Sequence, residues 1–306
     1  MKNLKMNIFL LLAIIYITPL MIISIFPNYN VRNIYKSNLN DENLRKSSVS
    51  GKFHINNNWT DVKTAGICTG EGTESDPYII ENLVIDGGGL GNCILIENSD
   101  VFFKIQYCVF NNTGDEYYDA GVKLIDVDNG QLLNNNASGD AFGFYLNRSN
   151  NNIIVGNRLT GKGGLYHGIC EGNIIYLNNF NGKLMDMFIL TKDESSYRFY
   201  SPKKATYKYE GNTYKKYLGN YWSGFSRISD DNDDGIGDEP QIYYDSYELL
   251  IDKYPLLEPI ENYEIVKFSG DSGGVIPSYN LFFLIGLVSI SSIVILSKLN
   301  KTIKQN

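Results

Sequence analysis

The residues with the clearest capacity for chemistry form an acidic stretch, Asp230-Asp231-Asn232-Asp233-Asp234-Gly235-Ile236-Gly237-Asp238. Oxygen-bearing side chains alternate along its first half, and the following glycine permits a sharp turn. Ca²⁺ takes roughly six to eight oxygen ligands, and this alternation on a tight loop directs every second side chain at one centre. The predicted ion is structural and closes one end of the fold. The expected calcium ligands are Asp230, Asn232, Asp234, the backbone carbonyl of Ile236, and Asp238.

This loop departs from an EF-hand. The last loop position holds Gln241 instead of a bidentate glutamate, and no helical pattern flanks it. It is closer to the calcium loops of extracellular repeat modules, with Asp245 or Asp252 left to complete the ligand shell. The alternative is a solvated acidic loop without an ion, in which the carboxylates repel one another.

A second motif, Gly270-Asp271-Ser272-Gly273-Gly274, matches the nucleophile segment of chymotrypsin-like proteases. That chemistry needs a histidine base and a buried aspartate that a double β-barrel holds in place. The chain has only two histidines, His54 and His167, and neither has this context. We interpret the motif as a chance match in a Gly/Ser-rich linker.

Glycan cleavage is a further hypothesis, and it rests on scattered charges. Inverting hydrolysis needs two carboxyl groups about 6.5–9.5 Å apart, whereas a lyase needs a basic residue near a metal. No recognisable signature joins these residues, and single aspartates at strand ends are usually turn formers. The candidate carboxylates are Asp126, Asp128 and Asp140, and the candidate bases are Arg148 and Arg158.

These residues must be positioned by a repeating β-structure. Ile94–Ile96 aligns with Val122–Leu124, then with Phe144–Leu146, then with the neighbourhood of Ile169. A parallel series aligns Gln131–Leu133 and Asn136 with Asn152–Ile154 and Asn157, and then with Asn173–Ile175 and Asn178. The units are about 22 residues long, which is too short for a propeller blade.

Each unit holds short alternating apolar runs separated by Asn, Gly, Ser or Asp, which predicts strands and tight turns. Three short strands per unit make one coil of a parallel β-helix, and stacked coils lie about 4.8 Å apart. The stacked asparagines are expected to bond from coil to coil. The predicted fold class is therefore all-β, a right-handed parallel β-helix with a helical segment at each end of the chain.

The ends of the chain predict membrane attachment. Lys2 and Lys5 precede an apolar run over 8–26, which is typical of a signal peptide or signal anchor. A second apolar run over 281–297 is just long enough to cross a bilayer, and three lysines follow it. By the positive-inside rule the lysine-rich tail is cytoplasmic and the β-helix lies outside the cell. We expect the cell membrane as a partner.

Composition and cysteine usage restrict the partners further. The net charge of -7 argues against nucleic acid. The four cysteines, Cys68, Cys93, Cys108 and Cys170, permit disulfides outside the cell, with Cys68–Cys93 as one pairing and buried free thiols as the alternative. The predicted organisation is a signal segment 1–27, a linker 28–50, a β-helix 51–182, a β-helix end with the acidic loop 183–262, a linker 263–279, a membrane span 280–298 and a tail 299–306.

Several segments in this order resemble the NosD-type β-helix family, which belongs to the wider class of pectate-lyase-like, carbohydrate-associated right-handed β-helices. They are GTESDPYIIENLVIDGGG at 72–89, the Asn-rich repeats, LGNYWSGF at 218–225, DDNDDGIGD at 230–238 and DKYPLLEP at 252–259. The resemblance covers about residues 51–260 and implies the fold more strongly than the function. The family is named after a periplasmic protein of copper-site assembly, but this chain offers few soft ligands: two histidines and, beyond the signal segment, Met185 and Met187.

The sequence therefore favours a non-enzymatic, membrane-anchored surface protein that binds a polysaccharide or an envelope protein. The extended face of a solenoid suits such binding. A polysaccharide lyase or glycoside hydrolase is the alternative, and copper-site assembly is the third hypothesis.

Overall fold

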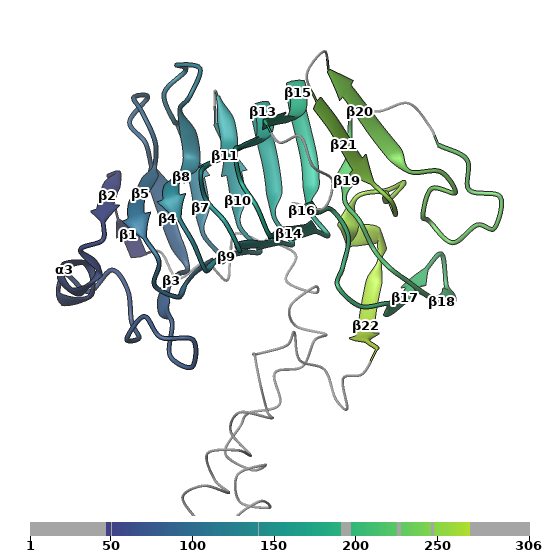
Figure 1. The fold of residues 1–306 in the computed structure, drawn as a ribbon, viewed down its shortest axis with the longest axis horizontal. Helices are drawn as coiled ribbons and strands as arrows, with labels where there is room; N and C mark the ends of the chain where they lie inside the picture. The colour runs from purple at the N-terminus through teal and green to yellow at the C-terminus, as the bar shows by residue number, and fades with distance from the viewer. Residues whose placement is uncertain are drawn as a thin grey trace, which may run out of the picture.

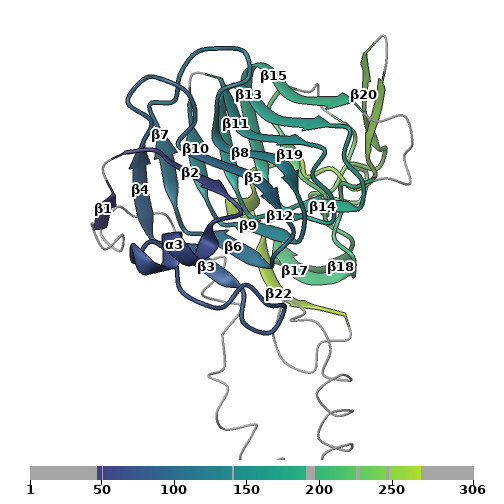
Figure 2. The same cartoon turned by 60° about the vertical axis from the view of Figure 1, so that its left-hand side comes forward.

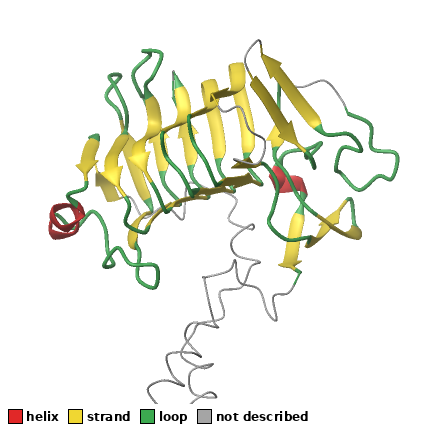
Figure 3. Ribbon diagram, viewed as in Figure 1, coloured by secondary structure: helices red, strands yellow, loops and turns green. Residues whose placement is uncertain are grey.

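The structure is a computed structural model that describes residues 47–49, 51–139, 141–190, 197–224, 228–245 and 248–269. Over these ranges the chain winds into a parallel β-solenoid with a smaller antiparallel part at its C-terminal end (Figures 1 and 3). Within the described residues, helix is confined to α3 (Trp59–Thr64) and the 3-10 turn η2 (Ile260–Asn262). The predicted all-β parallel solenoid is confirmed.

Three walls of parallel strands enclose the core (Figure 2). Wall A contains β2 (Phe53–Asn56), β5 (Ile94–Ser99), β8 (Ala120–Val127), β11 (Phe142–Asn147) and the second halves of β13 (Arg158–Gly168) and β15 (Asn179–Leu190). Wall B contains β3 (Tyr78–Glu81), β6 (Phe103–Gln106), β9 (Gly130–Leu133), β12 (Ile153–Val155), β14 (Asn173–Tyr176) and β16 (Tyr197–Arg198). Wall C contains β1 (Ser47–Val49), β4 (Leu83–Asp86), β7 (Val109–Asn111), β10 (Asn136–Ser138), the first halves of β13 and β15, and β19 (Tyr221–Trp222).

The long strand β13 turns the corner between walls C and A, and a register shift falls between Gly161 and Gly163. Gly161 has a φ of +153°, and a Cβ atom there would lie 2.7 Å from the carbonyl oxygen of Ala141. Only glycine fits this bend, because any side chain would collide with the neighbouring coil.

The core is built from inward columns of aliphatic side chains. Ile94–Ile96 pairs with Val122–Leu124, which pairs with Phe144–Leu146, as the repeat predicted. The next partner is Leu165–His167, so the alignment with Ile169 was wrong. Alternation directs every second residue inward, and the inward members of this column are completely buried. Each coil therefore covers the aliphatic side chains of the previous one.

A buried asparagine ladder runs through the turns between walls B and C. The side-chain amide of Asn135 donates to Asn157 Oδ1 (3.1 Å), that of Asn157 to Asn178 Oδ1 (2.9 Å), and that of Asn178 to Asn220 Oδ1 (2.9 Å). The prediction that Asn136 belongs to this ladder was wrong. It aligned Gln131 with Asn152, whereas Gln131 pairs with Ile153. This first step of the repeat is one residue longer than predicted, which places Asn136 in β10 and Asn135 in the ladder.

Both ends of the solenoid are closed by an aromatic side chain. At the N-terminal end α3 brings Trp59 into the core, where it stacks on Tyr78 at 5.1 Å and donates to Ser99 Oγ (2.8 Å). At the other end Trp222 stacks on Phe180 at 4.4 Å. These tryptophans cover the apolar side chains that a terminal coil would otherwise expose.

The C-terminal part of the described chain forms two antiparallel units. One sheet contains β17 (Ala205–Tyr209), β18 (Asn212–Lys216) and β22 (Glu264–Phe268), and the other contains β20 (Gln241–Asp245) and β21 (Glu248–Asp252). The β17–β18 hairpin turns at Glu210 and Gly211, both at positive φ.

The predicted linkers were wrong where strands form. Ser47–Val49, within the expected linker 28–50, is β1 and pairs with β4. Glu264–Phe268, within the expected linker 263–279, is β22 and pairs with β17. The predicted signal segment, membrane span and GDSGG motif lie outside the described residues. Among the described residues, no helix has the length and apolar character needed to cross a bilayer.

The disulfide between Cys68 and Cys93 is not formed. All four cysteines are free thiols buried in the fold, as in the alternative prediction. Burial raises the pKa of Cys93 to about 11 and the pKa values of Cys108 and Cys170 to about 12. These thiols are therefore protonated at neutral pH and pack as small apolar groups.

Candidate functional site

The outward side of wall A carries one column of side chains, a single residue from each successive strand. Strand register places His54, Leu95, Lys123, Tyr145 and Tyr166 in line. Tyr145 and Tyr166 stack with ring centroids 4.2 Å apart and an interplanar angle of 6°. The column therefore changes from polar to aromatic along the solenoid.

A loop folds over the aromatic part of this column. Residues 115–119, an insertion between the repeats, bring Tyr118 edge-on to Tyr145 and Tyr166, with ring centroids 5.7 and 6.1 Å away. Tyr117 lies edge-on to Phe142 at 6.0 Å. We call Tyr117, Tyr118, Phe142, Tyr145 and Tyr166 the tyrosine platform. Its inner rings are buried, whereas Tyr117 and Tyr118 remain 54% and 50% exposed.

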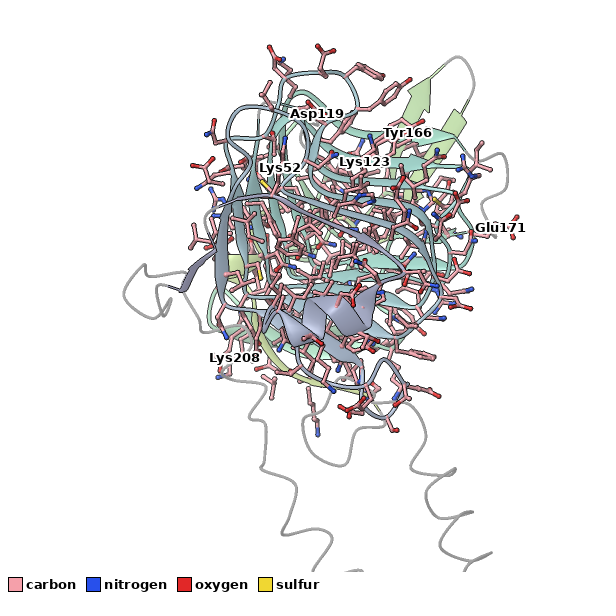
Figure 4. The ribbon with its side chains drawn as sticks, turned by 90° about the vertical axis from the view of Figure 1, so that its left-hand side faces the viewer. Lys52, Asp119, Lys123, Tyr166, Glu171 and Lys208 are labelled. Atoms are coloured by element: carbon pink, nitrogen blue, oxygen red, sulfur yellow. The ribbon has the colours of Figure 1, made fainter. Side chains whose placement is uncertain are left out.

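Lys123 links the platform to the polar part of the column. Its ammonium group donates to the Tyr118 carbonyl (2.9 Å) and lies 4.7 Å from the Tyr145 ring centroid. Burial lowers the pKa of Lys123, and the carboxylates of Asp119 and Glu97 partly oppose this shift. Figure 4, viewed from the N-terminal end, shows Asp119, Lys123 and Tyr166 on the same side of the molecule.

The arrangement combines exposed aromatic faces with charged hydrogen-bonding groups. Tyr117 and Tyr118 are about half exposed to solvent, and Lys123 and Asp119 lie beside them. Further along the wall His54 Nε2 lies 2.6 Å from Glu97 Oε2. Sugars have apolar ring faces and hydroxyl edges, so this combination suits them.

Among the described residues considered for glycan cleavage, Asp126 and Arg148 pair with each other, and no hydrogen bond or ion pair joins them to Asp128 or Arg158. Asp126 has positive φ and forms a two-bond ion pair with Arg148, at 2.7 and 2.6 Å, which lowers the pKa of Asp126. Asp128 accepts the backbone N–H of Asn150 (2.8 Å). Arg158 lies 3.6 Å from Glu261, and Asp140 is outside the described residues. The described members hold turns or surface ion pairs.

A family model described as Periplasmic copper-binding protein (NosD) matches residues 26–227. The chain belongs to the NosD family. The observed parallel solenoid fits the right-handed β-helix of NosD proteins, so the resemblance in the sequence is confirmed. No curated protein sequence and no solved structure matches this chain.

The NosD match includes the tyrosine platform but ends before the acidic loop. Within that loop Asp230 accepts the backbone N–H groups of Asp234 (3.1 Å) and Gly235 (2.8 Å). Asp238 accepts the N–H of Asp231 (2.6 Å) and the amide of Asn232 (2.9 Å). The predicted ligands thus lie in one turn, where their carboxylates hold the backbone.

Three tyrosine side chains from neighbouring C-terminal segments donate hydrogen bonds to the backbone of the loop. Tyr214 donates to the carbonyl of Asp233 (2.8 Å), Tyr207 to that of Asp234 (2.9 Å), and Tyr263 to that of Gly235. Ile236 forms a bridge with Leu256 and is buried. The loop is therefore part of the C-terminal core and not a free surface turn.

A lysine already neutralises one of the predicted calcium ligands. Asp234 is 1% exposed, accepts the N–H of Ile236 and forms an ion pair with Lys216. Across the part of the chain that the structure describes, no group of three or more His, Cys, Asp or Glu side chains is arranged to hold a metal ion. Asp252 is buried elsewhere, and the side chain of Asp245 is not described.

Sequence reasoning missed the platform. The repeat aligned Lys123 with Tyr145, as the strand register confirms, but the tyrosines of the insertion carried no repeat signal. The adjacent pair Tyr117-Tyr118 in a polar insertion was the only available indication, because a loop with two large aromatic residues must pack them somewhere.

Proposed function

We propose that this NosD-family protein is a membrane-anchored surface protein that binds glycans on its tyrosine platform without cleaving them. The observation that carries the proposal is the half-exposed pair Tyr117 and Tyr118, held rigidly by the rings of Phe142, Tyr145 and Tyr166. An aromatic pair on a packed base loses little conformational freedom when a sugar stacks on it.

The charged neighbours support a glycan over an apolar partner. Lys123 offers donors beside the exposed rings, and the carboxylates of Asp119 and Glu97 interact with its ammonium group as further acceptors. Two described outward positions further along wall A are the polar His54 and the half-buried Leu95. A chain of sugars laid along the wall would meet rings at one end and hydrogen-bonding groups at the other.

The location is part of the proposal. The description of the matching family names the periplasm, a compartment outside the cytoplasmic membrane. The apolar segments at 8–26 and 281–297, with lysines beside both, support an anchored chain whose solenoid lies outside. Both segments lie outside the described residues.

Glycan binding is tested with the full-length protein on a glycan array, followed by titration of the strongest ligand. We expect Tyr117→Ala/Tyr118→Ala to weaken binding at least about tenfold, since each stacked ring contributes about 1 kcal/mol. Val266→Ala, an exposed apolar residue on β22, is the control and leaves binding unchanged. Equal affinity of the double variant and the parent protein would exclude the platform as the glycan-binding site. If no glycan on the array binds, an envelope protein is left as the partner.

Product analysis of the same ligand distinguishes binding from catalysis. The alternative, a β-helix lyase or hydrolase, predicts shortened sugars after incubation. We expect the ligand to be recovered intact. Released product that Lys123→Gln abolishes would instead make Lys123 the base of a lyase.

Copper handling is the function that the family description names. His54 lies outward on β2, whereas His167 lies inward on β13, four strands away along wall A, or about 19 Å at the usual strand spacing. Copper prefers clustered soft ligands, so this separation favours glycan binding. Copper that stays bound through dialysis against a chelator would reverse the preference.

We also propose that the acidic loop binds calcium as a structural ion. The alternating oxygens at 230, 232 and 234 support it, with the Ile236 carbonyl and Asp238 as further ligands, and the ion takes the place of the Lys216 ammonium group at Asp234. A calcium-bound native state is expected to melt several degrees higher in CaCl₂ than in EGTA. Asp230→Asn should remove this difference, and Glu74→Gln should keep it. The same melting temperature in CaCl₂ and in EGTA would overturn the proposal.

A further inference from the structure

A second binding site lies in the antiparallel C-terminal part, away from the tyrosine platform. A cavity of about 300 Å³ opens between the β17–β18 hairpin, the acidic loop and the segment after β21. Its lining includes three lysines, two tyrosines and one aspartate: Lys204, Lys216, Lys253, Tyr217, Tyr254 and Asp238. Lysines predominate here although the chain carries a net charge of -7.

The positive charge of this cavity is only partly compensated. Lys216 forms an ion pair with the buried Asp234. Both carboxylate oxygens of Asp238 accept hydrogen bonds from its own loop, from the N–H of Asp231 (2.6 Å) and the amide of Asn232 (2.9 Å). Lys204 and Lys253 form no ion pair with any described residue. Within the described part of the chain, no carboxylate therefore neutralises these two ammonium groups, which line the cavity.

Aromatic rings form the wall next to these lysines. The ring centroids of Tyr217 and Tyr254 lie 5.2 Å apart, and Tyr200 packs behind them at 5.7 and 5.2 Å. The Lys204 ammonium lies 5.7 Å from the Tyr217 centroid. The wall is rigid because each ring contacts the other two.

We propose that this cavity binds a single acidic sugar, a monosaccharide with a carboxylate group. The sugar ring stacks on Tyr217 and Tyr254, and its carboxylate lies between Lys204 and Lys253. The volume is at the small end of ligand pockets, roughly 300–1,000 Å³, so one sugar ring fits better than a chain. An anion held by two ammonium groups gains charge-assisted hydrogen bonds.

The proposal goes beyond glycan binding on wall A. The two sites share no residue, and they differ in chemistry: the platform has one lysine beside acidic groups, whereas the cavity has lysines in excess. A protein with both sites would hold a glycan on its wall and recognise an acidic sugar at its C-terminal end.

The test is a calorimetric titration of the full-length protein with D-galacturonate, with D-galactose and inorganic phosphate as parallel ligands. We expect saturable, salt-sensitive binding of galacturonate, and galactose and phosphate binding at least about tenfold more weakly. Lys204→Gln/Lys253→Gln should weaken galacturonate binding at least about tenfold. Lys208→Gln, a lysine on β17 paired with Glu264 and labelled in Figure 4, should bind as the parent does.

Three outcomes would overturn the proposal. They are the absence of saturable galacturonate binding, equal affinity in the double lysine variant, and phosphate binding as tight as galacturonate, which would indicate an adventitious ion only. The Tyr117→Ala/Tyr118→Ala variant keeps the cavity intact, so it should retain galacturonate binding. A failure of the platform and a failure of the cavity are thereby separated.

Discussion

Replacing Asn157 by alanine is expected to lower the free energy of unfolding by about 4 kcal/mol. The Asn157 amide group donates to the carbonyls of Leu132 (2.8 Å) and Val155 (3.1 Å) and to Asn178 Oδ1 (2.9 Å). Its oxygen accepts the N–H of Asn135 (2.9 Å) and the Asn135 amide (3.1 Å). Truncation leaves these buried groups without partners, and each unsatisfied group costs about 1–3 kcal/mol, partly relieved by relaxation.

The neighbouring repeat provides the matched control. Asn136 is the residue that sequence alignment placed in the ladder, but it lies in β10, half-exposed, and pairs with Arg158 through the backbone. Asn136→Ala should change stability by no more than about 0.5 kcal/mol. Urea unfolding of both variants, monitored by circular dichroism, measures the two changes in stability. Similar midpoints for Asn157→Ala and Asn136→Ala would show that the ladder does not stabilise the solenoid.

The buried carboxyl group of Asp252 is expected to contribute more to the stability of the protein at pH 4 than at pH 7. Desolvation raises the pKa of Asp252 to about 6, despite N–H donors from Trp222 (3.0 Å), Asn220 (2.8 Å) and Tyr254 (3.1 Å). Because the folded pKa exceeds the unfolded value of 3.8, the folded state binds more protons between these values. The stabilisation is complete below the unfolded pKa and is lost as the pH rises through about 6.

The size of this effect follows from the pKa difference. A shift of roughly two units corresponds to about 3 kcal/mol of unfolding free energy in total, of which about 2 kcal/mol falls between pH 4 and pH 7. Other carboxylates, such as Asp86 and Asp126, have lowered pKa values and act in the opposite direction, so the total curve mixes several groups. The difference between the parent protein and Asp252→Asn isolates the contribution of Asp252.

Asparagine cannot ionise, so Asp252→Asn should lack this component of the pH profile. It should also be less stable at acidic pH, because its single amide oxygen can replace only one of the two carboxyl oxygens. With that oxygen on the side of Asn220 and Trp222, its NH₂ group faces the N–H of Tyr254, which it cannot accept. The measurement is a series of urea unfolding curves for both proteins from pH 4 to pH 7. A constant difference in unfolding free energy across that range would show that Asp252 keeps an ordinary pKa.

Asp252 also connects the two parts of the molecule. It accepts a hydrogen bond from Asn220, the last member of the asparagine ladder, and from Trp222, which covers the final coil. The adjoining residues Lys253 and Tyr254 line the basic cavity. Changes at this carboxylate are therefore expected to reach the cavity as well as the end of the solenoid.

The sequence by itself determined the walls of this protein. Alternation is a local property, because each residue of a strand faces inward or outward according to its position in the pleat. The columns through Ile96, Leu124 and Leu146 could therefore be predicted from the repeat, and with them the parallel stacking. The β17–β18 hairpin was equally local, since Glu210 and Gly211 specify its turn.

Only the tertiary structure decided which turn residues are buried and what the loops contact. A one-residue difference in repeat length exchanges Asn135 for Asn136 in the ladder, and nothing local to either asparagine distinguishes them. The packing of Tyr118 on Tyr166 and the pairing of Lys216 with Asp234 join residues from separate elements. Such contacts depend on how distant segments meet in space, which a pattern along the chain does not encode.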